Sequence, residues 1–370
     1  MLNKLIYVTY QTFPAGTANS LQTISNIKYF IKNGIDVELY FPLRNNESSD
    51  NINEIQNYYD ISENFKLKGI RHPYPHGKLN LLKPLWFHIS HYLWSKKTVK
   101  NIKDKFHGNI QFFTRSDWVA FFLAKNGRKV VFECHQTSKL RNLIVRKIKN
   151  YENVKFIYLN NHLQNYYKNV NNSIVLHNGV DPELLKKTKS NKKSNSVIFI
   201  GNVSRFNKSR GLEVILEHFA TKEIGGKFKL DIVGGPSGDV ERLRNFIKIN
   251  GLQDSIKIHG RLGREKTAKI LNETEIGLLV NTKSNLHSYK YTSPLKYFEY
   301  LLGDLAVVAL DFPSHRDLPF SERINYFSLE DKKSLLIALE EAKKCQPLNK
   351  NELKLISLDN RIKEIINFLN

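Results

Sequence analysis

The sequence contains few cysteines and no long apolar segment. Its 370 residues include two cysteines, Cys134 and Cys345, which are too few for a disulfide framework or a cysteine metal site. No run of 18 apolar residues occurs, and Met1-Leu2-Asn3-Lys4 leads directly into an apolar segment without the layout of a signal peptide. We therefore expect a soluble protein of a reducing compartment, which is the cytoplasm.

Motifs of several enzyme classes are also missing. The sequence has no Asp-x-Asp pair and no histidine cluster with the spacing of a metal site. It lacks the Gly-Lys-Ser/Thr of a P-loop and the regular glycine spacing of a dinucleotide-binding loop. These absences argue against ATPases and nicotinamide enzymes, and we expect no metal and no cofactor.

Apolar segments alternate with helical patterns along the whole chain, which is 41% hydrophobic and long enough for two domains. The strand-like segments are 5–10, 37–41, 110–114, 130–133, 156–159 and 173–176, then 197–200, 229–233, 256–259, 276–280 and 305–310. The polar segment 186–196 marks a loop or the start of a second domain. The pattern predicts an α/β protein with two Rossmann-like doubly wound domains facing a central cleft, over 1–185 and 186–350. A C-terminal helix over 351–370 could cross back to the first domain.

Basic residues outnumber acidic ones, with a formal net charge of +22 spread over both halves, so no nucleic-acid module stands out. The run Lys78–Lys105 holds seven lysines and one acid among aromatic and aliphatic residues, and Lys139–Lys149 holds five basic residues and no acid. Such mixtures suit an anionic membrane surface, although a core helix with a solvated basic edge explains them equally well. The residues expected on a membrane or acceptor side are Trp86, Trp94, Lys96, Lys97 and Lys100.

Two positions in the first half suit a ligand. Residues 11–20 form a loop between the first strand and helix, where Gly16 allows a ligand to approach the backbone. The segment Phe132-Glu133-Cys134-His135 ends a strand with polar residues, and such ends face the ligand in doubly wound folds. His135 is the best candidate for contacting a reacting group, although a lone histidine is more often structural.

Three cations lie in the first loop of the second half. Arg205, Lys208 and Arg210 surround a strand-to-helix junction between Gly201 and Gly211. Cations at such a junction can neutralise a diphosphate that also faces a helix N-terminus. The loop is therefore a candidate diphosphate clamp, with a basic surface loop as the alternative.

A third segment, Ser293-Pro294-Leu295-Lys296-Tyr297-Phe298-Glu299-Tyr300, predicts a new helix that begins at the Ser-Pro step. Backbone N–H groups at this start would form an anion site. Glu299 lies on the same helix, where its carboxylate could accept hydrogen bonds from the two hydroxyls of a ribose. Phosphate and ribose together indicate a nucleotide, whereas the alternative is an ordinary amphipathic helix.

These motifs, in this order, resemble family 4 glycosyltransferases of the GT-B fold over nearly the whole chain. The segments that carry the resemblance are the Gly16 loop, Phe132–His135, Leu176-His177-Asn178-Gly179-Val180-Asp181, Gly201–Gly211, Ile232-Val233-Gly234-Gly235, Ile258-His259-Gly260 and Ser293–Tyr300. The resemblance implies retaining, metal-independent transfer of a sugar from a UDP- or GDP-linked donor to a glycan or lipid-linked acceptor in cell-envelope polysaccharide synthesis. The donor would be held by the second domain and the acceptor by the first.

The resemblance also assigns roles to residues. Glu299 would bind the ribose, Ser293, Pro294 and Leu295 the phosphates, Gly16 the diphosphate-sugar end of the donor, and His135 the transferred sugar. The enzyme would lie in the cytoplasm or on the inner face of the cytoplasmic membrane.

The sequence departs from the family pattern at two positions. The basic residue that usually follows the loop glycine is Asn202 here, so Arg205 or Lys208 would substitute for it, and Arg210 takes the place of the usual lysine before Gly211. The first acid of the family's paired-glutamate motif is replaced by Tyr291. A GT-B sugar-nucleotide 2-epimerase and a non-catalytic basic scaffold on a degenerate transferase fold therefore remain as alternatives.

Overall fold

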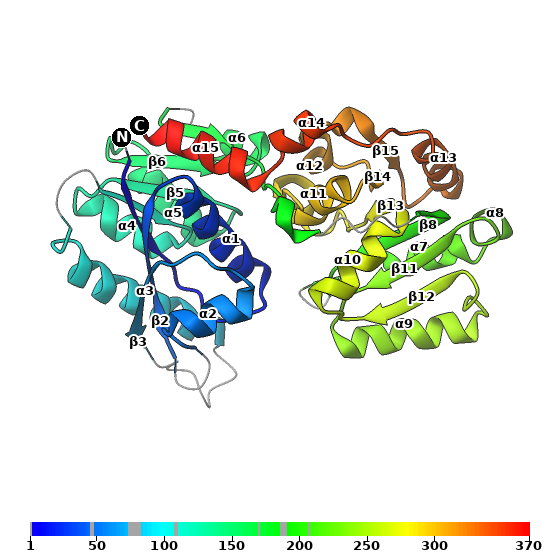
Figure 1. Cartoon of the computed structure of the whole chain (residues 1–370), viewed down its shortest axis with the longest axis horizontal. Coiled ribbons are helices and arrows are strands. Elements are labelled where there is room, and N and C mark those ends of the chain that lie inside the picture. Colours follow the sequence, from blue (N-terminus) through cyan, green and yellow to red (C-terminus); the bar gives the residue numbers. More distant parts are fainter. Residues whose placement is uncertain are drawn as a thin grey trace. The chain divides into compact units, whose positions relative to one another are not determined.

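A computed structural model describes residues 2–44, 48–72, 83–106, 110–168, 171–185, 191–205 and 208–370 (Figure 1). The chain divides into two compact units, one formed by 1–176 with 358–370 and the other by 177–357. The chain therefore passes from one unit to the other at 176–177 and back at 357–358. The boundaries predicted from the sequence follow residues 185 and 350. The last helix belongs to the first unit.

Within the described residues, the first unit is built on a parallel seven-stranded sheet of order β3-β2-β1-β4-β5-β6-β7. Its strands are β1 (Lys4–Val8), β2 (Asp36–Leu43), β3 (Lys66–Arg71), β4 (Ile110–Thr114), β5 (Val130–Cys134), β6 (Val154–Tyr158) and β7 (Ser173–Val175). Its helices are α1 (Ala18–Lys32), α2 (Ile52–Tyr59), α3 (Lys83–Ile102), α4 (Asp117–Lys125), α5 (Lys139–Ile148), α6 (Asn161–Tyr167) and α15 (Leu358–Leu369).

The order of the strands changes direction at β1, which pairs with β2 on one side and β4 on the other. Right-handed crossovers then place α1 on one face of the sheet and α4 and α5 on the other. Helix α15 packs beside α1, and its Leu358, Ile362 and Ile365 lie in the same buried core as residues of β1 and β2. Helix α1 begins at Thr17, whose side chain accepts a hydrogen bond from the N–H of Ser20.

The second unit contains a parallel six-stranded sheet of order β12-β11-β8-β13-β14-β15 among the residues that the structure describes. Its strands are β8 (Lys193–Ile200), β11 (Lys229–Val233), β12 (Ile256–Gly260), β13 (Thr274–Leu279), β14 (Ala306–Leu310) and β15 (Ile324–Phe327), with a small hairpin of β9 (Ser204–Arg205) and β10 (Lys208–Ser209). Its α-helices are α7 (Leu212–Phe219), α8 (Lys222–Gly225), α9 (Ser237–Ile249), α10 (Arg264–Asn272), α11 (Leu295–Leu302), α12 (Pro313–Arg316), α13 (Lys332–Ala342) and α14 (Lys350–Leu355). A π-helical turn, η3 (His287–Tyr291), precedes α11.

The fold class predicted from the sequence is confirmed, because both sheets are parallel and covered by helices. The predicted segment 186–196 leads into the first strand of the second unit's sheet, which matches one of the two alternatives for it, the start of a second domain. Residues 193–196 belong to strand β8, not to a loop, because Lys193 pairs with Thr274 of β13 and Ser196 pairs with Lys229 of β11. These polar residues form the amino-terminal end of a strand that is central in its sheet, so backbone pairing with β11 and β13 fixes the segment without an apolar pattern.

Candidate functional site

Two glycines shape the loop that follows β8 in the second unit. Gly201 has φ +133° and donates its N–H to the carbonyl oxygen of Val233 at 2.8 Å. Gly234 has φ +156°, and a Cβ added there would lie 1.6 Å from the carbonyl oxygen of Gly201. Any side chain at Gly234 would therefore clash with backbone, so the carboxyl ends of β8 and β11 can approach one another only with glycine present.

Two cations lie against the first of these glycines. A Cβ added at Gly201 would lie 2.9 Å from both Cε and Nζ of Lys296 and 3.7 Å from Nη1 of Arg210. Nζ of Lys296 also lies 4.0 Å from the centre of the Phe199 ring. Burial and the charge of Arg210 lower the pKa of Lys296 well below its usual value. The structure therefore brings Arg210, a predicted diphosphate-binding residue, together with Lys296, to which the sequence assigned no role.

Glu299 lies one turn after Lys296 on α11 and is half-buried. Burial raises the pKa of its carboxyl group, while the nearby charges of Lys296 and Arg264 oppose that shift. The second unit thus gathers a carboxylate and two cations around the carboxyl end of β8 and the start of α11. This set of groups can accept hydrogen bonds from hydroxyls and neutralise phosphates.

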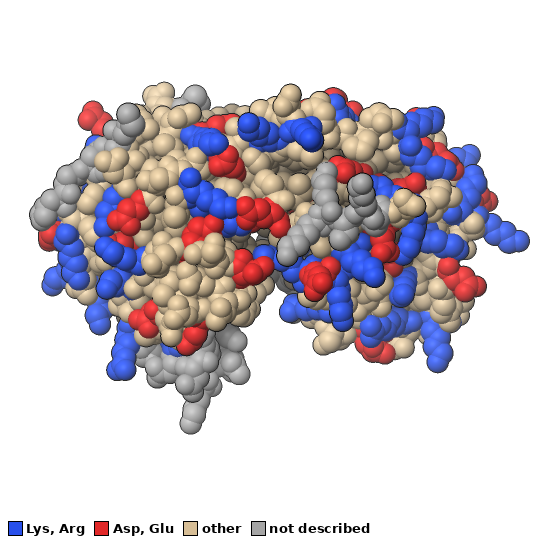
Figure 2. All heavy atoms as spheres, viewed as in Figure 1, with Lys and Arg blue, Asp and Glu red and all other residues tan. Residues whose placement is uncertain are grey.

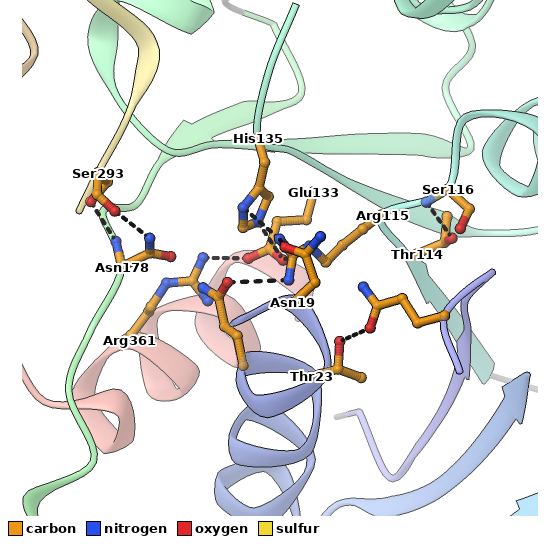
Figure 3. A network of polar contacts seen from close by, with 12 residues as sticks. Asn19, Thr23, Thr114, Arg115, Ser116, Glu133, His135, Asn178, Ser293 and Arg361 are labelled. Carbon is orange, nitrogen blue, oxygen red and sulfur yellow. Dashed lines mark hydrogen bonds and ion pairs between the residues drawn. The ribbon is translucent and has the colours of Figure 1, made fainter. Parts of the chain in front are cut away.

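The Ser-Pro step before α11 is held by the segment that begins the second unit. The backbone N–H of Asn178 donates to Oγ of Ser293 at 3.0 Å, and Nδ2 of Asn178 donates to the carbonyl oxygen of Ser293 at 2.5 Å (Figure 3). Ser293 is 3% exposed, and α11 begins after Pro294 as expected. The phosphate-binding roles of Ser293, Pro294 and Leu295 stay predictions, but Ser293 has a structural partner.

Only the backbone is described for Arg205 and Lys208, two residues of the predicted diphosphate clamp. The backbone of Arg205 pairs with that of Lys208 in the hairpin of β9 and β10. Their side chains lie outside the described part of the structure, as does Lys78 of the first basic run. Tyr291, which replaces a family glutamate, is buried and contributes packing inside its unit.

In the first unit, the Gly16 loop follows β1 and is fixed by Tyr59. The hydroxyl of Tyr59 accepts a hydrogen bond from the N–H of Ala15 at 2.7 Å and donates one to its carbonyl oxygen at 2.9 Å. Gly16 itself is exposed, and a Cβ added to it would lie 3.2 Å from the hydroxyl of Tyr58. The loop is therefore held in a fixed shape with its glycine accessible, as the predicted ligand role requires.

A buried carboxylate organises the strand ends next to this loop. Glu133 at the end of β5 is 0% exposed and pairs with Arg361 of α15, while Nε of Arg115 lies 3.6 Å from its Oε2 (Figure 3). Nη2 of Arg115 donates to Oδ1 of Asn19, on α1, at 3.2 Å. Although burial alone would raise it, the pKa of Glu133 is lowered because Arg361, His135 and Arg115 surround the carboxylate. The cluster joins β4, β5, α1 and α15 around one charge.

His135 belongs to the same cluster. Its Nδ1 lies 2.7 Å from Nη2 of Arg115, and its Nε2 lies 3.0 Å from Oε2 of Glu133. Because a guanidinium can only donate, Nδ1 accepts, and the neutral ring carries its proton on Nε2. Burial and the charge of Arg115 lower the pKa of His135 to about 3, so the ring is neutral at pH 7. Both ring nitrogens thus face protein groups, and the predicted contact with a sugar stays a prediction.

Helices α3, α4 and α5 form a basic surface on the first unit, and Figure 2 shows Lys and Arg on the surfaces of both units. The exposed basic residues described on these helices are Lys96, Lys97 and Lys100 on α3, Lys125 on α4, and Lys139, Arg146 and Lys147 on α5. Arg141 of α5 is buried and pairs with Asp117, the one acid of the three helices. The exposed apolar side chains on α3 are Leu85, Phe87, Ile89 and Leu93. The basic side chains predicted to face a membrane or an acceptor, Lys96, Lys97 and Lys100, are exposed.

The two tryptophans expected on this surface are less exposed than the lysines. Trp94 is 1% exposed and packs against Tyr10, with ring centroids 5.5 Å apart, so the expectation that it faces a membrane is wrong. The large, mostly apolar indole ring favours the core, and the sequence alone does not show which face of α3 turns inward. Trp86 is half-buried.

Metal clusters and membrane-spanning helices are both absent from the described residues. No group of three or more His, Cys, Asp or Glu side chains there could hold a metal ion. No helix among these residues is both long and apolar enough to cross a membrane.

The sequence analysis missed several residues of these clusters. Lys296 stands inside the Ser293–Tyr300 motif, but nothing in the sequence shows that its side chain reaches Gly201. Arg361 and Arg115 lie 228 and 18 residues from Glu133, so no local pattern links them. Asn178 lies within the Leu176–Asp181 motif, but only the structure shows that it holds Ser293.

No protein-family model matches the sequence, and no curated protein matches it. Solved structures do resemble the chain. A sucrose-phosphate synthase from Thermosynechococcus elongatus is 13% identical with a TM-score of 0.71, over 99% of this chain and 98% of that one. The lipopolysaccharide outer core galactosyltransferase WaaB in its apo form is 12% identical with a TM-score of 0.65, over 99% of both chains.

Anabaena Alr3699/HepE in complex with UDP and glucose is 13% identical with a TM-score of 0.61, again over 99% of both chains. These likenesses extend over whole chains and include both units. Together with the two parallel sheets, they define the fold as GT-B, the fold of these glycosyltransferases.

Proposed function

We propose that the chain is a retaining, metal-independent glycosyltransferase of family 4, which moves a hexose from a UDP- or GDP-sugar to a glycan. The observation that carries the proposal is the cluster at the end of β8, where Gly201, Arg210 and Glu299 gather in one unit. Cations there suit a diphosphate, and the half-buried carboxylate suits ribose hydroxyls. The HepE structure holds UDP and glucose, which supports a nucleotide-sugar donor for this fold.

In the first unit, we propose that the transferred sugar lies beside the Gly16 loop and His135. Burial, Arg115 and Arg361 would keep the histidine ring neutral, and Arg115 and Glu133 would fix its orientation. Because Nδ1 and Nε2 face Arg115 and Glu133, the neutral ring would contact the sugar through its carbon atoms and would add no charge to the site. Replacing His135 with alanine should lower kcat more than donor affinity, because contacts that strengthen in the transition state act on kcat.

A panel of UDP-, GDP- and ADP-sugars tests the function. We expect one donor to raise the melting temperature and to be hydrolysed slowly to its nucleoside diphosphate. A ligand at 100 times its Kd stabilises the folded protein by about 2.7 kcal/mol. Isomerisation of the sugar without nucleotide release would identify a 2-epimerase instead, and binding of no donor would favour a scaffold.

Metal independence is a separate part of the proposal. Cations such as Arg210 would neutralise the diphosphate in the role that a divalent ion has in metal-dependent enzymes. Nucleotide release from the donor should therefore persist in EDTA. Loss of activity in EDTA with recovery in Mn²⁺ would contradict this part while leaving the transfer reaction intact.

We further propose that the surface of α3, α4 and α5 docks on an anionic membrane, which would bring a lipid-linked or envelope acceptor to the first unit. The support is the combination of exposed lysines with exposed Leu85, Phe87 and Leu93 on α3. Basic residues near an anionic lipid surface contribute about 1 kcal/mol each, before screening by salt.

Flotation with liposomes tests the docking surface. The protein should float with vesicles that contain acidic lipid, stay unbound with neutral vesicles, and dissociate at high salt. Changing Lys96, Lys97 and Lys100 to Gln should abolish flotation, whereas changing the exposed Lys222, Lys248 and Lys333 of the second unit should leave it unchanged. Equal flotation of both triple variants would show that these helices are not the docking surface.

A further inference from the structure

We propose that Lys296 is a donor-binding residue, whose ammonium group contacts the diphosphate from α11 and replaces the cation that is missing at Asn202. The inference rests on the proposed function and adds a residue to its donor site. It concerns the second unit alone, in which all of the groups involved lie.

The ammonium group of Lys296 lies beside the backbone of Gly201. Nζ of Lys296 occupies the space beside the Cα of Gly201, so that a Cβ there would come within 2.9 Å of it. Asn202 is the next residue and is exposed. A basic side chain at position 202 and the side chain of Lys296 would therefore supply positive charge at neighbouring places, one from the loop and one from the helix.

Two positive charges lie close together beside Gly201. Lys296 and Arg210 both lie against Gly201, and like charges this close repel one another. The Phe199 ring, 4.0 Å below the ammonium group, stabilises it only in part. An anion that contacts both cations would relieve the repulsion, and a diphosphate carries enough negative charge to do so.

Three titratable or charged groups face Lys296. Arg210 comes from the segment before α7, Glu299 from α11 itself, and His315 from α12, where Lys296 helps to lower the histidine's pKa to about 4. Burial and Arg210 lower the pKa of Lys296, and Glu299 opposes the shift. A bound diphosphate would raise that pKa again, so binding should be accompanied by uptake of a proton above neutral pH.

Calorimetric titration with UDP, GDP and ADP tests the proposal on the full chain. We expect Lys296→Gln to weaken the nucleotide that binds best by at least tenfold and Lys296→Arg to weaken it much less. The double variant Asn202→Lys with Lys296→Gln should recover most of the affinity, because it restores a cation beside Gly201. Lys248→Gln, which changes an exposed lysine on α9, is the matched control and should bind as the wild type does.

A second readout separates ligand contact from a structural role. Titrations at several pH values between neutrality and the ordinary pKa of lysine, in buffers of different ionisation enthalpy, should show proton uptake on binding to the wild type. Lys296→Arg should show much less uptake, since arginine does not titrate in this range. Uptake that is unchanged in Lys296→Arg would overturn the proposal.

These experiments separate failure of the proposed function from failure of the role of Lys296. A wild-type protein that binds none of the nucleotides would overturn the proposed function and this inference with it. A wild type that binds a nucleotide, with Lys296→Gln equal to it in affinity, would overturn the role of Lys296 alone. Loss of binding in Lys296→Gln without recovery in the double variant, and with a lowered melting temperature, would assign the lysine to folding.

Discussion

Charged side chains that are partly removed from water decide most of the chemistry at the scale of single residues. Glu299 is one of them, since burial raises its pKa while Lys296 and Arg264 favour its charged form. Glu299→Gln keeps the shape of the side chain but loses the charge that strengthens acceptance from two hydroxyls. We expect donor affinity to fall about tenfold with the melting temperature preserved, as measured by nucleotide titration. Turnover and affinity equal to the wild type would refute the ribose role.

His135 gives a second prediction at this scale, about acid stability. Its pKa is about 3 in the folded protein, and an unfolded histidine titrates near 6.5. The folded state therefore binds fewer protons, and the stabilisation that is present above pH 6.5 is lost as the pH falls towards 3. Between pH 7 and pH 5 we expect a loss on the order of 1–2 kcal/mol from this residue.

Urea unfolding of the wild type and of His135→Gln at the two pH values measures that loss. His72, His91 and His315 have lowered pKa values as well, but they are present in both proteins. The difference between the two pH dependences therefore belongs to His135. Parallel curves for the two proteins would mean that His135 does not titrate abnormally.

The residues of the candidate site that the sequence predicts are those within recognisable motifs. Gly201, Arg210 and Glu299 lie together as their motifs indicate, because each stands at a strand end or a helix start. Lys296 could not be placed in the same way, since the direction of a lysine side chain depends on neighbours from another strand. Trp94 was misplaced for the related reason that composition does not show which face of a helix turns to the core.

At the scale of elements, helix α11 is fixed to its sheet by one glycine and one tyrosine. A Cβ added at Gly277 of β13 would lie 2.3–2.4 Å from ring atoms of Tyr300. The Tyr300 hydroxyl accepts a hydrogen bond from the N–H of Ile200 at 3.1 Å and donates one to the carbonyl oxygen of Leu278 at 3.3 Å. The ring therefore lies flat on β13 and connects α11 with the end of β8.

Gly277→Ala should displace this ring and loosen the donor site. We expect a loss of about 1–3 kcal/mol, the usual result of overfilling a packed core. Chemical denaturation measures the loss, and Gly238→Ala is the control, because a Cβ there meets no atom within 4 Å. Similar stabilities for the two variants would show that α11 can shift without cost.

Helix α15 offers a matching prediction for the first unit. Arg361 on α15 pairs with the fully buried Glu133. Arg361→Met removes one of the two guanidinium groups that face this carboxylate and leaves Arg115, so we expect a loss below the roughly 3–5 kcal/mol of a fully broken buried pair. Arg361→Met combined with Glu133→Leu should be less stable than the single variant, because Arg115 then loses the carboxylate that it faces. Chemical denaturation measures both losses, and a double variant more stable than the single one would contradict this account.

The strands and helices with strong apolar patterns were predictable, and the polar ones were not. Strand β3 reads Lys-Leu-Lys-Gly-Ile-Arg and forms an edge of its sheet, where little apolar surface is needed. The start of β8 is also polar, although β8 is a central strand that pairs with β11 and β13. Pairing with a neighbouring strand fixes both elements, and pairing is a long-range property that a local pattern does not contain.

At the scale of the whole molecule, each unit has its own sheet and core. Nucleotide binding should therefore stabilise the second unit selectively. All three tryptophans, Trp86, Trp94 and Trp118, belong to the first unit, so their fluorescence reports on that unit alone. We expect UDP or GDP to raise one calorimetric transition and to leave the midpoint followed by tryptophan fluorescence unchanged. A common shift of both would mean that the units unfold together.

The return of α15 to the first unit also has a consequence for synthesis. A ribosome completes residues 1–176 long before it reaches Leu358, yet Leu358, Ile362 and Ile365 belong to the core formed by β1 and β2. Until α15 leaves the exit tunnel, Glu133 lacks Arg361, and the apolar face beside α1 is open to water. The second unit, residues 177–357, has no such dependence on a later segment. Although domains generally fold in the order of their synthesis, here the unit that is made second should be the first to reach its native structure.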